Sequence, residues 1–401
     1  MMALGARFSN NESFKAVDPR QRGEEFAARA RKLLDLTNIS VTTIQACILL
    51  GTICFSKSEM QSEALYYSIA VRLALILDLP HRHCDEEVER QVNLRIWCSL
   101  HMMDLWSSIG LSIPQQLDFV DGSPLPTNEE TFLSLKIESR LNIDTNRRGL
   151  WSEMLILSRI WRRIHQVNTA SVSGTIKPNS LIEAVDALAH ELEAWASSLT
   201  PNLQENFENL EHYASIGLGN AFVALHLGYH YYHEVLFYQF LAKNDVLNNS
   251  GRSTERYQAH CEEHALAFCD LLYQCRALDR DTCQCRYVMV GHMLVITSTI
   301  YMHRLLFSEN EATVSLVRQR LSQNFEILTD LQKFWAPLDV ALSRLQVFHN
   351  ACRKSIDESF RMDQWMLKFI LEHGSSVVER ALSQTSEPDT LYSWFSQTFQ
   401  V

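Results

Sequence analysis

The sequence is poor in glycine and proline. Its 401 residues include 13 glycines and 9 prolines, which is about half the share usual in globular proteins. Because these two residues mark tight turns, their scarcity argues against β-sandwiches and β-barrels and favours helices. Strand signals are also nearly absent, since no two β-rich runs flank an Asn-Gly or Asp-Gly turn.

An excess of positive charge is also lacking. Lysine and arginine number 36 against 47 aspartates and glutamates, which gives a formal net charge of −11. A surface dedicated to nucleic acid needs clustered cations to contact phosphates, so this balance disfavours one.

The sequence contains no apolar run that predicts a membrane-spanning helix. Residues 213–233 contain no Asp, Glu, Lys or Arg and are long enough to cross a bilayer. The same stretch holds His226, His230 and His233, and polar groups at that density are costly in hydrocarbon. The pattern therefore predicts a buried core helix.

Motifs for phosphate binding and nucleophilic catalysis are missing. There is no Walker A sequence and no G-x-S-x-G elbow, and Gly217 and Gly219 lack the third glycine and preceding strand of a dinucleotide fingerprint. The N-terminus does not read as a secretory signal, so the ten cysteines are predicted to be reduced thiols in the cytosol or nucleus. We predict no catalytic residue, no metal and no cofactor.

Helical spacing of apolar residues covers most of the chain. It predicts an all-α protein, an array of roughly ten to fourteen helices in one large domain. The predicted helices are Glu24–Leu36, Thr42–Phe55, Ser58–Leu79, Asp85–Gly110, Leu150–Thr169, Asn179–Leu199, Ala214–Ala242, Ser253–Leu278, Arg286–Phe307, Glu311–Phe334, Pro337–Ser355 and Phe360–Glu372. The segment from Leu111 to Asn128 carries three prolines and is predicted to be a structured loop.

The helix that precedes Pro80 carries one charge in its apolar middle. Ser58 and Gln61 have the spacing of a capping box at its start. Apolar residues then fill nearly every position up to Leu79, so Arg72 is expected to be buried and to need a partner, for which Asp104 is the first choice. The alternative is that Arg72 extends along the helix to reach solvent.

One short pattern suggests zinc chemistry. Residues 260–264 spell H-x-x-E-H, which places His260 and His264 on one helical face with Glu263 between them. No third ligand can be named, and the neighbourhood reads as the solvated start of an ordinary helix. A zinc metalloenzyme is therefore a minor alternative function.

Three other clusters have ordinary interpretations beside their chemical ones. The histidines at 226, 230 and 233 fall near one helix face, and His81, His83 and Cys84 lie at a helix end, where histidine suits the last carbonyls. The thiols of Cys275, Cys283 and Cys285 match no structural zinc motif. The charged residues Arg280 and Asp281 nearby predict an exposed turn, in which these thiols have no chemical role.

Two segments together resemble a known family. The family's "AxRxA" helix end and the residues after it are similar to the stretch around Arg72, Leu79 and His81, and its next helix and proline loop are similar to the stretch around Glu89, Arg95, Trp97, Asp104, Gly110 and Pro114. This family is the fungal-specific transcription factor domain, the middle homology region of fungal zinc binuclear cluster regulators. Asp78 replaces the family's glycine, and the arginine of its "GRP" motif is missing.

The resemblance implies a gene-control function. It implies a fungal transcription regulator, for which control of a metabolic pathway or gene cluster is one role. Residues 1–40 would form a partial N-terminal helix and loop, 41–200 the domain core and 201–401 the C-terminal part of the same regulatory body. The nine residues above are implied to be structural. No C-x-x-C pattern of the zinc cluster occurs in the sequence, so we expect a chain that begins inside the family domain and lacks its own DNA-binding module.

The implied partners are other transcription regulators or the transcription machinery, and a homodimer or a small-molecule effector is compatible with the family. Direct DNA contact is not expected without the zinc cluster, and no membrane is implied. The implied location is the nucleus, with the cytoplasm as the alternative. A helical small-molecule-binding or protein-interaction module, built on the aromatic helix from Tyr229 to Tyr238, is the main alternative function.

Overall fold

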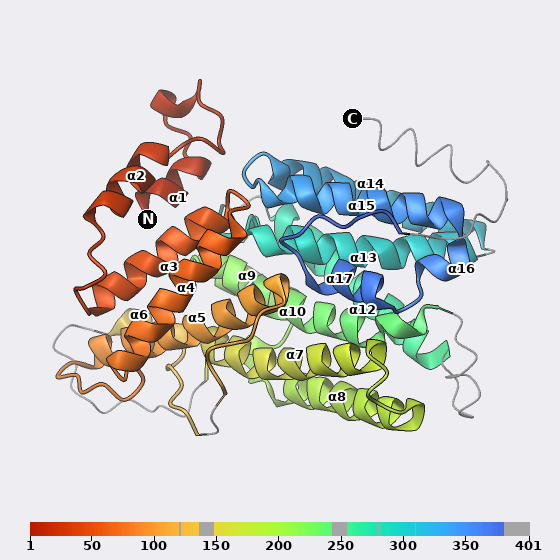
Figure 1. The fold of residues 1–401 in the computed structure, drawn as a ribbon, viewed down its shortest axis with the longest axis horizontal. Coiled ribbons are helices and arrows are strands. Elements are labelled where there is room, and N and C mark those ends of the chain that lie inside the picture. Colours follow the sequence, from red (N-terminus) through yellow and green to blue (C-terminus); the bar gives the residue numbers. More distant parts are fainter. Residues whose placement is uncertain (120–121, 136–147, 243–254, 279–280, 309, 381–401) are drawn as a thin grey trace. The chain divides into compact units, whose positions relative to one another are not determined.

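The computed structural model describes residues 1–119, 122–135, 148–242, 255–278, 281–308 and 310–380 (Figure 1). Helices account for its regular structure, and the described residues contain no strand, so the all-α prediction is confirmed. The α-helices are α1 (Met2–Gly5), α2 (Glu24–Leu33), α3 (Val41–Phe55), α4 (Met60–Ile76), α5 (Glu87–Leu111), α6 (Glu129–Ser134), α7 (Leu150–Val172), α8 (Pro178–Ser198), α9 (Phe207–Ser215), α10 (Gly219–Phe237), α12 (Glu255–Ala277), α13 (Val288–Phe307), α14 (Glu311–Gln332), α15 (Pro337–Lys354), α16 (Ile356–Ser359) and α17 (Gln364–Leu371). The 3₁₀ helices are η1 (Ala6–Phe8), η2 (Glu12–Phe14), η3 (Pro201–Leu203), η4 (Tyr238–Phe240) and η5 (Asp281–Cys283).

The chain forms two compact units. Unit 1 consists of Met1–Arg159 and Lys333–Pro337, and unit 2 consists of Ile160–Gln332 and Leu338–Val401. The division falls within α7, so the first residues of that helix belong to unit 1 and the remainder to unit 2.

Unit 1 is built around α3, α4 and α5, and α3 runs beside α4 (Figure 1). Ala70 and Ala74 of α4 are fully buried in a core that also contains Trp97 of α5. At Gly51 of α3 an added Cβ would lie 2.5 Å from the ring of Tyr67 in α4. Small residues therefore let these helices approach closely while larger apolar residues fill the remaining core.

Unit 2 has α10 at its centre. Nearly all of this helix is buried, including its three histidines and Glu234, because apolar and aromatic residues lie on every side of it. It packs against α12, α9 and α8, and α13 packs against α14. No helix among the described residues is long and apolar enough to cross a membrane, and α10 is the buried core helix that the sequence predicted.

Several predicted helix boundaries are wrong. The helices predicted to end at Leu36 and Leu79 end at Leu33 and Ile76, and the helix predicted to begin at Phe360 begins at Gln364. The single helix predicted from Ala214 to Ala242 is interrupted between α9 and α10, where Gly217 has a φ of 83°. Ser58 has a φ of 64° and does not cap α4, which begins at Met60 after an N-cap without a side-chain bond. The N-cap of α5 is Glu86 rather than Asp85. The predicted break at 244–251 lies outside the described residues.

Candidate functional site

The proline loop after α5 folds back along that helix. Asp104, near the C-terminal end of α5, accepts hydrogen bonds from the backbone N–H groups of Gln116 and Leu117, both at 2.9 Å. One turn earlier in α5, the ring of His101 stacks on Phe119 with 5.0 Å between the centroids. Later residues of the loop therefore contact earlier residues of α5. The loop runs antiparallel to the helix.

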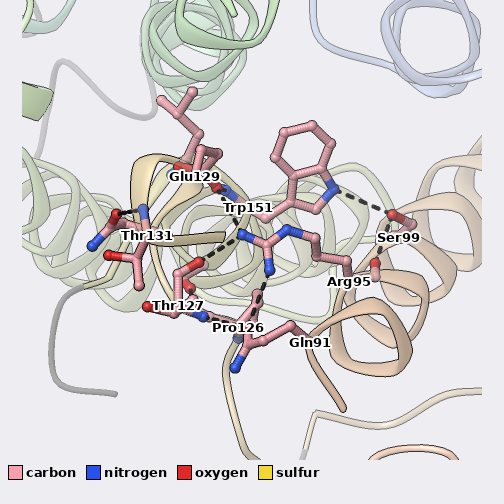
Figure 2. A network of polar contacts seen from close by, with 11 residues as sticks. Gln91, Arg95, Ser99, Pro126, Thr127, Glu129, Thr131 and Trp151 are labelled. Carbon is pink, nitrogen blue, oxygen red and sulfur yellow. Dashed lines mark hydrogen bonds and ion pairs between the residues drawn. The ribbon is translucent and has the colours of Figure 1, made fainter. Parts of the chain in front are cut away.

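The end of the loop is held by two side chains one turn apart on α5. The side-chain oxygen of Gln91 accepts a hydrogen bond from the backbone N–H of Thr127 at 2.8 Å. Arg95 donates to the Thr127 carbonyl at 2.8 Å and to the same Gln91 oxygen at 3.1 Å, so its guanidinium lies at the centre of the network in Figure 2. The face of this guanidinium covers the ring of Phe132, 3.9 Å from its centroid. The backbone at Thr127 is thus fixed through both its donor and its acceptor.

Glu129, the first residue of α6, connects the loop to α7. Its carboxylate lies 3.9 Å from the Arg95 guanidinium and accepts hydrogen bonds from the backbone N–H groups of Leu150 at 2.8 Å and Trp151 at 3.3 Å. These N–H groups begin α7 and have no partner within the helix. The negative charge of this carboxylate also interacts favourably with the positive end of the α7 helix dipole. Figure 2 places Glu129 between Arg95 and the start of α7.

The approach of Glu129 to α7 leaves no room for a side chain at Gly149. A Cβ added there would lie 2.4 Å from the Glu129 carboxylate and 2.5 Å from the Asn128 Cα. Two further bonds hold α7: the Trp151 indole N–H donates to the Ser99 hydroxyl at 3.3 Å, and the Ser152 hydroxyl donates to the Pro126 carbonyl at 2.7 Å.

Burial governs the electrostatics of this region. It lowers the pKa of the Arg95 guanidinium, while the charge of Glu129 acts in the opposite direction. Burial, with the nearby charge of Arg159, lowers the pKa of His101 to about 4, so the ring against Phe119 is neutral at pH 7. The arrangement has the chemistry of a scaffold: its charged groups bind backbone or each other, and it orders a loop on a helix.

The predicted site residues divide into two groups. Arg95 and Asp104 both hold the loop, Trp97 and Leu79 lie in the core of unit 1, and Gly110 is buried inside α5. The others lie toward solvent: Arg72, Glu89 and Pro114 are exposed, and His81 contacts Asp78 at 3.0 Å on the surface.

The predicted burial of Arg72 and its pairing with Asp104 are wrong. Arg72 is exposed on α4, whereas the Asp104 carboxylate is buried and binds loop backbone. The sequence pattern failed because an almost continuous apolar run does not reveal which helix positions face outward. The exposed residues Leu65, Leu75 and Ile76 also belong to that run.

The departure at Asp78 has a physical explanation. Its φ is 46°, in the left-handed region, which glycine adopts readily and aspartate tolerates better than most residues. The glycine that the resemblance places at this position in the family fits the same backbone conformation.

Sequence reasoning missed Gln91, Thr127, Glu129, Gly149 and Trp151. One signal was present: Gln91, Arg95 and the serine at position 99 repeat every four residues and therefore share a face of α5. Nothing in the sequence indicated that this face would meet the end of the loop.

The histidines considered as metal ligands contact protein groups in unit 2. His226 donates to the Leu203 carbonyl at 3.0 Å, and His230 lies 2.9 Å from both the Glu205 carboxylate and His264 Nδ1. His260 pairs instead with Glu263 at 3.2 Å. Among the described residues, no group of three or more His, Cys, Asp and Glu side chains is arranged to hold a metal ion.

The aromatic helix considered for ligand binding lies within the core of unit 2. The Tyr231 hydroxyl is 3.1 Å from His292 Nε2, and the Tyr238 hydroxyl is 2.8 Å from Thr299 Oγ1. Tyr232 stacks on Trp161 with 4.8 Å between the centroids. These are the contacts of a packed core, in which the phenols bond to their own chain.

Comparison with known proteins identifies part of the chain. Residues 1–197 match the model of a family described as "Fungal specific transcription factor domain". The matched region includes the loop, α5, the Arg95 network and the start of α7. No curated protein and no solved structure matches the chain.

Proposed function

Because residues 1–197 belong to the fungal-specific transcription factor domain family, we propose that this chain is the regulatory body of a transcription regulator that acts through other proteins rather than through its own DNA-binding module. The family is one of transcription regulators and not of enzymes. The observation that carries the proposal is the family match over the region in which Arg95 and Asp104 fix the loop on α5.

Two properties of the chain support indirect action on DNA. The net charge of −11 opposes binding to a phosphate backbone. All ten cysteines of the sequence are buried in the two helical units and none forms a disulfide, so their positions do not correspond to those of a surface zinc cluster. We therefore propose that DNA contact comes from a partner regulator and that the chain resides in the nucleus.

Tethering tests the proposal directly. The full chain is fused to an unrelated DNA-binding domain, and transcription of a reporter with the matching site is compared with that from the DNA-binding domain alone. We expect the fusion to change reporter transcription. The Arg95→Met variant should lose most of this effect, and Arg82→Met, which removes a surface arginine from the same unit, should keep it.

Two measurements complete the test. Thermal unfolding of each variant separates a local loss of the loop from a failure to fold. In the organism that encodes the chain, a fluorescently tagged copy should be nuclear, and deletion should change the transcripts of a limited set of genes, such as a metabolic cluster. An inert tethered chain together with unchanged transcripts after deletion would contradict the proposal.

A further inference from the structure

Three cysteines of unit 2 come together at the end of α12. Cys275 lies in the last turn of that helix, Cys283 ends η5, and Cys285 follows two residues later. All three are at most 1% exposed, so the predicted exposed turn with incidental thiols is wrong. The turn is folded inward, and its thiols face one another.

The thiols of Cys275 and Cys283 are in direct contact. The S–H of Cys283 points at the sulfur of Cys275, with the two Sγ atoms 3.2 Å apart, and the S–H of Cys275 donates to the Cys283 backbone carbonyl. A disulfide bond is about 2.05 Å long, so closing this pair requires the sulfurs to approach by about 1 Å.

The turn that carries Cys283 is held on both sides. The Thr282 hydroxyl donates to the Ala214 carbonyl at 2.8 Å, and the Cys285 backbone N–H donates to the Asn220 side chain at 2.8 Å. Cys285 has a φ of 47°, a left-handed conformation that is uncommon for a residue with a side chain. These contacts keep Cys283 facing α12.

We propose that Cys275 and Cys283 are a reversible oxidation site, which hydrogen peroxide converts to an intramolecular disulfide. In the first step one thiol is oxidised to a sulfenic acid, and the peroxide O–O bond is reduced with release of water. In the second step the partner sulfur attacks the sulfenic sulfur, the S–S bond forms, and the hydroxyl leaves as water with the partner's proton. Overall, two thiols and one hydrogen peroxide give one disulfide and two waters.

Proximity, rather than thiol acidity, favours this pair. The hydrogen bond from Cys283 lowers the pKa of Cys275, but the hydrogen bond with Cys285 and burial raise it, and the net direction is upward. The thiolate fraction is therefore small at neutral pH, and oxidation is expected to be slow. Once a sulfenic acid forms on either residue, the partner sulfur is already in contact with it.

Mass spectrometry of the full-length protein tests the proposal. The native protein is treated with increasing concentrations of hydrogen peroxide at neutral pH. It is then denatured in the presence of N-ethylmaleimide, which blocks the remaining thiols, and digested with trypsin. Cleavage after Arg276 and Arg280 separates the two cysteines. A disulfide therefore joins two peptides, and the joined species should increase with peroxide from near absence to the main form and disappear with dithiothreitol.

Matched variants identify the bond. Cys283→Ser should abolish the linked species, whereas Cys285→Ser and Cys269→Ser, which remove a neighbouring thiol and another buried thiol of α12, should keep it. Complete alkylation of Cys275 and Cys283 at every peroxide concentration would overturn the proposal. Linkage of Cys275 to Cys285 in the unaltered protein would overturn it as well. If Cys283→Ser does not fold, fragment ions of the linked peptides from the unaltered protein assign the bond.

Discussion

In unit 1, charged side chains of one helix hold the backbone of a loop, whereas in unit 2 buried polar side chains hold the ends of helices and turns. Arg95 and Asp104 bind the loop in unit 1. In unit 2, Arg344 donates to the carbonyl of Lys368, in the last turn of α17, at 3.2 Å and to the carbonyl of Ser375, beyond that helix, at 2.8 Å. Three histidines donate to carbonyls there, His226 to Leu203, His292 to Ile370 and His303 to Leu241.

The two arrangements respond differently to pH. His226, His292 and His303 of unit 2 are neutral because burial lowers their pKa, so acid works against the folded state. Unit 1 contains the opposite case in Glu63 of α4, a buried carboxyl whose pKa burial raises to about 7. Unit 2 therefore depends on several buried neutral imidazoles, whereas unit 1 has one such ring in His101 and also holds Glu63, which is better tolerated when acid keeps it protonated.

The largest expected effect is the loss of unit 2 in acid. Burial lowers the pKa to about 4 for His226, His303 and His373 and to about 3 for His264, against an ordinary value of 6.5. Between these values the unfolded chain binds protons that the folded chain does not, so stability falls as the pH drops from about 6.5 toward 4. At full protonation the shifts to about 4 correspond to roughly 3 kcal/mol each and that of His264 to roughly 5 kcal/mol. Their sum is comparable with the 5–15 kcal/mol that stabilises a typical domain.

Hydrogen exchange followed by mass spectrometry at pH 7 and pH 5 measures this effect in each unit separately, after correction for the intrinsic exchange rate. Protection in α10 and α13 should fall before protection in α3 and α4. An earlier loss of protection in α3 and α4 would contradict the expectation that unit 2 is the more acid-sensitive unit.

The next largest effect is expected for Arg344→Met. Arg344 is 1% exposed, and its removal takes a hydrogen-bond donor from the carbonyls of Phe369, Glu372 and Ser375. Each such group costs about 1–3 kcal/mol, so we expect a loss of at least 3 kcal/mol in the free energy of unfolding, measured in urea. The control Arg353→Met, at an exposed position of the same helix, should change stability by less than about 0.5 kcal/mol. Equal effects of the two substitutions would contradict the role given to Arg344.

A smaller and more local effect is expected for Arg95→Met. The substitution keeps an apolar stem over Phe132 but removes the donors to Thr127 and Gln91, with an expected loss of about 2 kcal/mol. Exchange protection should fall in residues 116–119 and 122–127 and at the start of α7, while α3 and α4 stay protected. Arg95→Lys should behave similarly, because an ammonium lacks the planar fork of the guanidinium. Unchanged loop protection in both variants would show that Asp104 alone holds the loop.

The smallest expected effect is a gain in stability for Glu63→Gln. The Glu63 carboxyl accepts a hydrogen bond from Ser107 at 2.8 Å, which an amide oxygen can also accept. Its raised pKa means that the unaltered protein loses stability as the pH rises from about 4.5 through 7. The variant should gain roughly 1–2 kcal/mol over the unaltered protein at pH 8 and nothing at pH 4.5. Thermal unfolding at the two pH values measures the difference, and a uniform loss at both would show that the charge is not the cause.

Much of the helical architecture followed from the sequence. The predicted ends of α3, α8, α13 and α15 fall within two residues of the observed ones, because apolar periodicity and flanking prolines are local signals. The helix predicted from Ala214 to Ala242 concealed the turn at Gly217 because the apolar pattern continues across it. In the candidate site, Arg95 and Asp104 were nominated through the resemblance, but their contacts were not.

The sequence by itself determined that this chain is helical, acidic and similar to a family of gene regulators, because these properties depend on composition, spacing and motif order. Only the tertiary structure decided which polar groups meet. Asp104 binds the loop instead of Arg72, Glu129 caps a helix 21 residues later in the chain, and the Cys275 and Cys283 thiols face each other inside unit 2. Such pairings depend on where helices cross and how loops return, and residue spacing along the chain does not specify either.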